Sequence, residues 1–199
     1  MPVRLAPRLA RRALLFGGPS ACLLPWSAVG AADKLNISGT RGSIDFAIGD
    51  SRVFRTTGSF KDWQGFLQVD ENDVPKSMVQ VTVNTKSIQL LDTQQTQMMK
   101  GADFFDVEKF PEMTFRSTNV ERTGETTLKV GGEITLRGIT RPMLLAVSVT
   151  DRKPDAPPGA GYARFRGEGS LKRSEFGMTK FIDVVGDNVD ISIRADAWR

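Results

Sequence analysis

Three carboxylates lie close together in the chain, at Asp103, Asp106 and Glu108, and they are the first candidates for chemistry. Carboxylates at this spacing could act as a general acid and base or bind Ca²⁺. Their spacing does not match a calcium-binding loop, and no nucleophile paired with a base is recognisable beside them. Turn capping and surface ion pairs explain them more simply, and we predict that the protein is not an enzyme.

Two residue types that carry much of enzyme chemistry are missing. The sequence has no histidine, and its single cysteine, Cys22, lies in an N-terminal segment that we expect to be removed. The remaining chain therefore cannot form a disulfide, a thiolate nucleophile, a Cys/His zinc site or an imidazole-based triad. We expect no cofactor and no metal. Stability must come from an apolar core, which about 167 residues are enough to bury.

A second group of side chains suits binding. Met98 and Met99 are followed by Phe104, Phe105 and Phe110 in one short stretch. Methionine and phenylalanine around a concavity can accommodate a flexible apolar guest, although core packing is the ordinary role for any one of them. With apolar residues of the expected strands added, the candidate ligand contacts are Phe46, Met98, Met99, Phe104, Phe105, Phe115, Phe165 and Ile191.

Apolar and polar residues alternate through most of the chain, which is typical of strands with one buried face. The alternation covers residues 44–48, 79–83, 113–115, 128–136, 143–149 and 189–193, and residues 63–69 and 165–171 follow it with glycines inserted. With residues 53–60, this predicts about eight strands. Strands without intervening helices favour a sheet closed on itself. The expected fold is all-β, an eight-stranded antiparallel β-barrel with one short helix.

The expected helix covers residues 93–100. Asp92 is a suitable N-cap with Gln95 three residues later, and Gly101 stands where a C-terminal residue in the left-handed conformation would lie. We expect both methionines of this helix to face inward. A short turn is expected at 174–177. The proline-rich stretch 151–161 predicts a surface loop within one domain.

The sequence leaves open whether the barrel is hollow. An eight-stranded barrel is either just filled by side chains or holds one small ligand. Gly65, Gly132, Gly167 and Gly169 share the parity of the apolar residues on their strands. Their missing side chains could leave space on the buried face. Alternatively, these glycines could lie at bulges or barrel corners.

Residues 1–32 have the features of a cleaved signal peptide. Arginines precede a short apolar stretch at 13–24, and small residues crowd 27–32 before the first acid, Asp33. The apolar stretch is too short for a membrane-spanning helix, which needs about 20 residues. We therefore expect an exported protein with a signal peptide at 1–32 and one barrel domain at 33–199.

The charge balance argues against nucleic-acid binding. The chain has 27 basic and 23 acidic residues, a net charge of +4. The excess belongs to the expected signal peptide, whose arginines are Arg4, Arg8, Arg11 and Arg12. The remaining chain is neutral, so it has no general electrostatic attraction for a polyanion.

Five sequence blocks resemble the YceI-like family of exported bacterial proteins. Residues 58–67 read GSFKDWQGFL, 101–111 read GADFFDVEKFP, 113–118 read MTFRST, 136–142 read LRGITRP and 172–178 read KRSEFGM. The resemblance extends through nearly the whole expected mature chain. It implies a lipocalin-like barrel with a long apolar cavity, a periplasmic location, and binding of polyisoprenoid chains, quinone tails or other long-chain amphiphiles.

The chain departs from the family pattern in its histidines. The family usually has a basic residue and a histidine where this chain has QMMK at 97–100, and often a histidine at Arg137 and near Arg52. Their absence favours binding of the lipid tail over recognition of its head group. Four cations are candidate partners for a polar head at the rim, with solvated surface charge as the alternative: Lys61, Arg137, Arg141 and Arg173.

The predicted function is therefore a periplasmic binding protein for a long-chain isoprenoid, a quinone or a similar lipid, acting as carrier or store. Each buried methylene would contribute about 0.8 kcal/mol. The alternative is an interaction partner of a membrane electron-transfer or stress-response system without its own ligand. A carboxylate-based enzyme is the third hypothesis. Transient membrane contact is compatible with the first two, and the oligomeric state, a homodimer included, is left open.

Overall fold

The computed structural model describes residues 33–49, 55–70 and 72–199. The expected signal peptide at 1–32 lies outside this part, as do Arg52 and Val53, so the structure does not bear on them. In the described part, no helix is long and apolar enough to cross a membrane.

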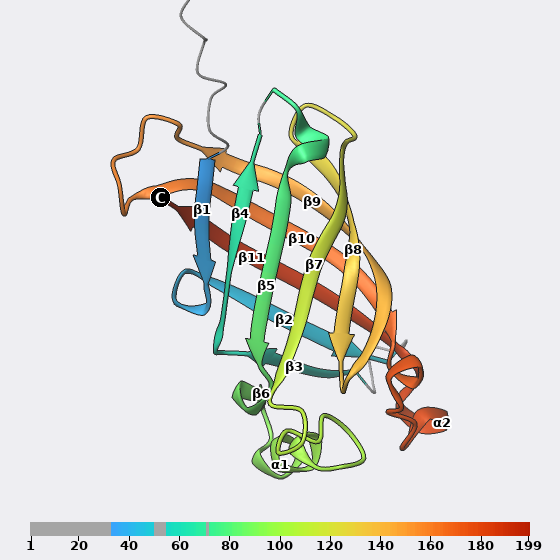
Figure 1. Ribbon diagram of the computed structural model, residues 1–199. Helices are drawn as coiled ribbons and strands as arrows, with labels where there is room; N and C mark the ends of the chain where they lie inside the picture. The colour runs from blue at the N-terminus through green and yellow to red at the C-terminus, as the bar shows by residue number, and fades with distance from the viewer. Residues whose placement is uncertain (1–32, 50–54, 71) are drawn as a thin grey trace, which may run out of the picture. The chain divides into compact units, whose positions relative to one another are not determined.

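Most of the described chain forms one antiparallel sheet (Figure 1). Its strands are β1 (Asp33–Ser38), β2 (Gly42–Ile48), β3 (Thr56–Phe60), β4 (Trp63–Val69), β5 (Met78–Asn84), β6 (Ile88–Leu90), β7 (Glu112–Arg122), β8 (Thr127–Leu136), β9 (Ile139–Arg152), β10 (Gly161–Lys172) and β11 (Asn188–Trp198). They pair in the order β1-β4-β5-β7-β8-β9-β10-β11-β2-β3-β6, and β1 also pairs with β11. This last pairing closes the sheet into a barrel.

Six of these strands are halves of three bent ones. β1 and β2 are separated only by the 3-10 turn Gly39–Arg41, β3 and β4 by residues 61–62, and β5 and β6 by the turn Thr85–Ser87. Because β1 pairs with β4 and β2 with β3, and likewise β4 with β5 and β3 with β6, the three bends lie at one level. Counted this way, the described chain forms eight strands. The predicted eight-stranded antiparallel barrel is confirmed.

Glycine makes the first bend feasible. A Cβ at Gly39 would overlap the carbonyl oxygen of Lys61, and a Cβ at Gly42 would overlap that of Arg194. The backbone can approach its neighbours this closely only without a side chain. Trp63, which is 3% exposed, packs beside both glycines.

The helix α1 (Thr93–Lys100) forms where it was predicted. The Asp92 carboxylate accepts a hydrogen bond from the Gln95 backbone N–H at 2.7 Å, which caps its first turn. The left-handed conformation predicted for Gly101 is wrong: its φ of −73° and ψ of 173° are extended. The chain leaves the helix directly into a turn in which Phe104 and Asp106 both donate their N–H to the Gly101 carbonyl.

The prediction that both helix methionines face inward is half wrong. Met99 is 5% exposed, whereas Met98 is 42% exposed. Neighbouring residues of a helix point about 100° apart, and here only Met99 lies on the side of the helix that packs against the barrel interior.

The connections at the C-terminal end largely follow the sequence. A 3-10 turn at Arg173–Phe176 ends at Gly177, which has a φ of 74°, where a short turn was expected. The loop predicted at 151–161 is confirmed for residues 153–160, whereas 151–152 end β9 and 161 begins β10. A second helix in the described chain, α2 (Ile182–Val185), was not predicted because it is a single turn.

Candidate functional site

The barrel is hollow. A cavity of about 580 Å³ runs through its interior, and inward-facing side chains from most strands form its wall. Leu67, Val81, Phe115, Phe165 and Ile193 are representative of this lining. We call this space the outer chamber. The strand pattern left open whether the barrel is filled or hollow, and this apolar cavity shows that it is hollow.

Polar side chains border the outer chamber at one end, which we call the mouth. They come from the β4–β5 connection, the β7–β8 turn and the facing ends of β9 and β10, and they are Gln68, Asp70, Ser77, Arg122, Glu125, Thr126, Arg152 and Tyr162. In Figure 1 these connections lie at the end of the barrel opposite α1 and α2. The cavity therefore has one polar end and apolar walls.

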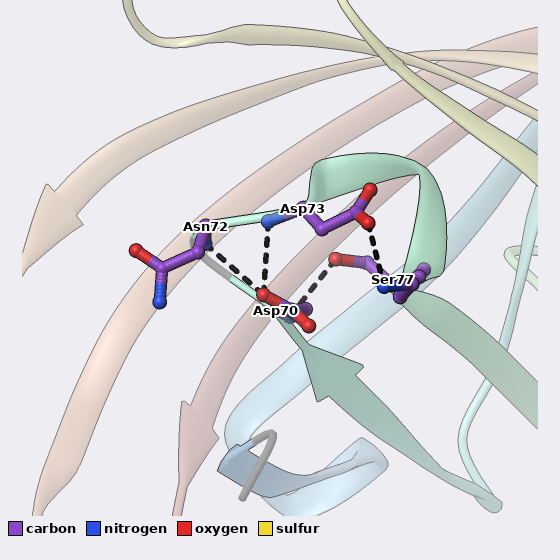
Figure 2. A network of polar contacts seen from close by, with 5 residues as sticks. Asp70, Asn72, Asp73 and Ser77 are labelled. Atoms are coloured by element: carbon purple, nitrogen blue, oxygen red, sulfur yellow. Dashed lines mark hydrogen bonds and ion pairs between the residues drawn. The ribbon is translucent and has the colours of Figure 1, made fainter. Parts of the chain in front are cut away.

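Hydrogen bonds hold one side of the mouth in a tight turn (Figure 2). The Asp70 carboxylate accepts the backbone N–H groups of Asn72 at 3.0 Å and Asp73 at 2.9 Å. The Asp70 N–H in turn donates to Ser77 Oγ at 3.1 Å. An aspartate that caps its own turn in this way fixes the backbone. Asp70 thus shapes the rim of the mouth.

A second, smaller cavity of about 60 Å³ lies at the other end of the interior. We call it the inner chamber. Met99 of α1, Phe104 and Phe105 of the following turn, Phe46 and Met178 are among its lining residues. Four residues line both chambers and so lie at their boundary: Ile44, Met113, Ile134 and Ile191.

Seven of the eight predicted contact residues line the interior, in two groups. Phe115 and Phe165 line the outer chamber, Ile191 lines both chambers, and the inner chamber takes Phe46, Met99, Phe104 and Phe105. Met98 lines neither. Most of the outer wall is aliphatic and was missed, although the alternation that predicted the strands already marked residues such as Val81 and Val130 as inward-facing.

The four predicted rim cations do not line the outer chamber or its mouth. Arg137 donates to the carbonyl oxygens of Ala102 and Phe104, and Arg141 donates to that of Thr140. Lys61 lies at the bend between β3 and β4, and Arg173 is 3% exposed beside the inner chamber. The charged residues at the mouth are instead Asp70, Arg122, Glu125 and Arg152. The prediction of these rim cations was wrong because the sequence does not show at which end of the barrel the cavity opens.

The four parity-matched glycines have different roles. Only Gly167 both lines the outer chamber and has room, because a Cβ there would lie 3.5 Å from the Ile193 Cβ. At Gly132 the Arg116 carbonyl oxygen and the Phe115 ring lie 2.5 Å and 2.6 Å from an ideal Cβ, so the space is filled. At Gly65 and Gly169 a backbone carbonyl of a neighbouring strand likewise approaches the position of a Cβ. The alternation of inward and outward residues correctly predicted that these glycines lie on the inward face. It could not predict which atoms occupy the space that each missing side chain leaves.

Two of the three carboxylates form ion pairs, and the third residue contributes through its backbone. Asp103 pairs with Lys180, and Glu108 pairs with Lys86 at 3.0 Å. Asp106 has a φ of 48°, and its carbonyl accepts the N–H groups of Lys109 and Phe110. The described residues contain no group of three or more Asp, Glu, His or Cys side chains placed to hold a metal ion.

A larger depression of about 1340 Å³ lies on the outside of the barrel, across β2, β3, β6, β9, β10 and β11. Outward-facing polar side chains make up much of its lining, among them Asp45, Ser59 and Glu168, and Arg55 forms an ion pair with Asp190 across it at 3.2 Å. The interior cavity is the better candidate site because its apolar wall gains free energy when a ligand displaces water.

Asp187 stabilises the β10–β11 connection near the inner chamber. Its carboxylate accepts hydrogen bonds from the Ser174 N–H at 2.9 Å and the Ser174 hydroxyl at 2.7 Å. Burial raises the pKa of Asp187, but these bonds and the charges of Lys172 and Arg173 outweigh it, so the pKa lies below its usual value of 3.8. The folded protein therefore favours the ionised form of the Asp187 carboxyl group.

Asp187→Asn should make the protein less stable at neutral pH and remove part of its acid sensitivity. A carboxyl whose pKa is lower in the folded state contributes stability above its unfolded pKa and loses it as the pH falls through the folded pKa. Urea unfolding at neutral pH and below about pH 3 would measure this. The difference in the free energy of unfolding between wild type and variant should be smaller at acid pH than at neutral pH. An equal difference at both pH values would contradict a lowered pKa of Asp187 in the folded protein.

Comparisons with known proteins agree with this architecture. The model of the YceI-like domain matches residues 35–197. Protein YceI of Salmonella newport is 31% identical over 170 residues, which cover 85% of this chain and 88% of that protein. The crystal structure of BcnA from Burkholderia cenocepacia superposes with a TM-score of 0.69 at 24% identity, over 80% of this chain and 98% of BcnA.

A further structural neighbour is described as a polyisoprenoid binding domain from Saccharophagus degradans. It superposes with a TM-score of 0.62 at 11% identity, over 84% of this chain and 98% of that one. At these identities the solved structures establish a shared fold. The family match over residues 35–197 and the Salmonella relative show that the chain belongs to the YceI-like domain family.

Proposed function

We propose that this protein binds the apolar chain of an isoprenoid, a quinone or a similar amphiphilic lipid inside its barrel and acts as a carrier or store in the periplasm. The observation that carries the proposal is the outer chamber, an apolar cavity of about 580 Å³ with a polar mouth. A barrel packed solid would have no such space. The polyisoprenoid binding domain with the same fold, and the signal-like N-terminus, support the proposal.

The volume sets the size of the ligand. A methylene occupies about as much space as one water, on the order of 30 Å³, so the outer chamber of about 580 Å³ accommodates roughly 20 chain carbons. That corresponds to about four isoprene units. Ten buried methylenes alone would contribute about 8 kcal/mol before the entropy lost on binding is subtracted. A longer chain would place its remainder outside the mouth.

The polar mouth sets the orientation of the ligand. The tail enters first, because the walls beyond the mouth are apolar, and the head stays beside residues such as Arg122, Glu125 and Thr126. Arg122 and Arg152 are balanced there by Asp70 and Glu125. A neutral polar head, such as an alcohol or a quinone ring, therefore suits this rim better than a strongly charged one.

The test is native mass spectrometry of protein purified from the periplasm without detergent, followed by organic extraction of what it carries. We expect a bound mass that corresponds to a lipid with a long apolar chain, and uptake of geranylgeraniol by protein that is empty. Empty protein that also takes up no geranylgeraniol would refute binding. It would favour a role as partner of a membrane system without its own ligand. Membrane contact and oligomeric state stay predictions.

A further inference from the structure

The boundary between the two chambers is made by side chains from opposite walls of the barrel. Ile44 of β2 and Ile191 of β11 are diagonal neighbours, because Ile44 pairs with Ile193 and Phe46 with Ile191. Met113 of β7 lies next to Phe115, which pairs with Ile134 of β8 on the same inward face. Each pair of boundary residues thus belongs to two adjacent strands.

The two pairs face each other. Around the barrel, β2 and β11 are separated from β7 and β8 by β9 and β10 on one side and by the bent strands β3/β4 and β5/β6 on the other. Equal spacing on both sides places the pairs across the interior from one another. We call this ring of Ile44, Met113, Ile134 and Ile191 the constriction, since both chambers end at it.

The inner chamber beyond the constriction is a short dead end. Met99, Phe104, Phe105 and Met178 are each at most 7% exposed and close it off beneath α1. Its volume of about 60 Å³ accommodates roughly two chain carbons. A tail that enters at the mouth therefore fills the outer chamber and then meets the constriction.

We propose that the constriction sets the length of chain that this protein binds, and that Met113 is the residue that determines it. The inference rests on the proposed function, since it concerns how a bound tail ends. The three isoleucines are branched at Cβ and held in few rotamers, whereas methionine is unbranched and adaptable. Met113 is only partly buried and points into both chambers. Its side chain is thus the adjustable member of the ring.

The expected change in length follows from the volumes. Met113→Ala removes Cγ, Sδ and Cε from the constriction and joins the inner chamber of about 60 Å³ to the outer one. Together these provide room for about five chain carbons, since each takes on the order of 30 Å³. One further isoprene unit should then become buried.

Affinities of linear prenols that differ by one isoprene unit, from geraniol to hexaprenol, test this by native mass spectrometry in competition. In the wild type, affinity should rise with each unit and then level off at the length that fills the outer chamber. In Met113→Ala the plateau should begin one isoprene unit later. Met113→Phe, whose bulkier ring narrows the constriction, should move it to a shorter length. This second variant preserves the test if the alanine variant unfolds.

Met143→Ala is the matched control. Met143 is 8% exposed and lines the outer chamber but not the inner one. Its truncation should weaken binding of all chains that reach it by a similar factor and leave the length of the plateau unchanged. Equal plateau lengths in wild type, Met113→Ala and Met113→Phe would overturn the proposal while leaving lipid binding intact. Wild-type protein that binds no prenol at all would instead overturn the proposed function, and this inference with it.

Discussion

Gly167→Leu should abolish most of the affinity for a long-chain prenol while leaving the barrel folded. Gly167 is buried on β10, lines the outer chamber, and has no Cβ neighbour closer than 3.5 Å. A leucine there would occupy the space of about four methylenes of the ligand. At about 0.8 kcal/mol each, their loss corresponds to about 3 kcal/mol, or on the order of 100-fold in Kd. Isothermal titration with geranylgeraniol would measure it.

The matched control for this variant is Gly131→Leu. Gly131 is on β8, where a Cβ would meet nothing closer than 3.9 Å, and it does not line the cavity. The same side chain is thus added outside the binding space, and affinity should stay within a factor of about two to three, as for an ordinary surface change. If both leucine variants bind geranylgeraniol as tightly as wild type, the ligand lies somewhere other than the outer chamber.

Arg173→Ala should destabilise the fold by about 3 kcal/mol or more. Arg173 is 3% exposed, and it donates from Nε to the Gly186 carbonyl at 2.8 Å and from Nη1 to those of Met178 and Lys180 at 3.1 and 2.7 Å. These bonds tie together the irregular connection between β10 and β11. Without the guanidinium, one buried and two part-buried carbonyls lose their donor, and the Asp187 carboxylate loses a nearby positive charge.

Urea unfolding followed by tryptophan fluorescence would measure this loss. Arg173→Lys should recover only a small part of it, because an ammonium cannot reproduce the planar fork that reaches several carbonyls. Arg141→Ala is the control: Arg141 is exposed and donates to the carbonyl of its neighbour Thr140, so its loss should change stability by at most about 0.5 kcal/mol. An equal effect of both alanine variants would contradict the structural role of Arg173.

The buried role of Arg173 shows where sequence reasoning fails on charges. Arg173 was expected at the rim of the cavity or as a solvated surface charge, because charged side chains are rarely buried. The structure buries it among backbone carbonyls that belong to an irregular connection. A sequence pattern does not show which backbone carbonyls lack a partner strand. It therefore could not predict that these carbonyls would accept hydrogen bonds from a buried arginine.

Met98 and Met99 show a similar limit on a smaller scale. The helix, its Asp92 cap and its bounds were predictable because they depend on neighbouring residues. Which methionine faces the barrel depends on how the helix lies against β6 and the turn after it, and that is decided by packing. One methionine became part of the inner chamber and the other lies exposed.

The sequence by itself determined most of the strands, their inward faces, the closed antiparallel barrel and the family, because alternation, turn residues and motifs are local properties of the chain. The strands β1 and β6 were not among the predicted segments. Only the tertiary structure decided that the barrel is hollow, which end carries the polar mouth, and that Met113 stands between two chambers. Gly132 and Gly167 show the reason: both lack an inward side chain, but Phe115 fills the space at one and the cavity occupies it at the other. Whether a gap is filled depends on side chains from other strands, and closure of the barrel brings those together.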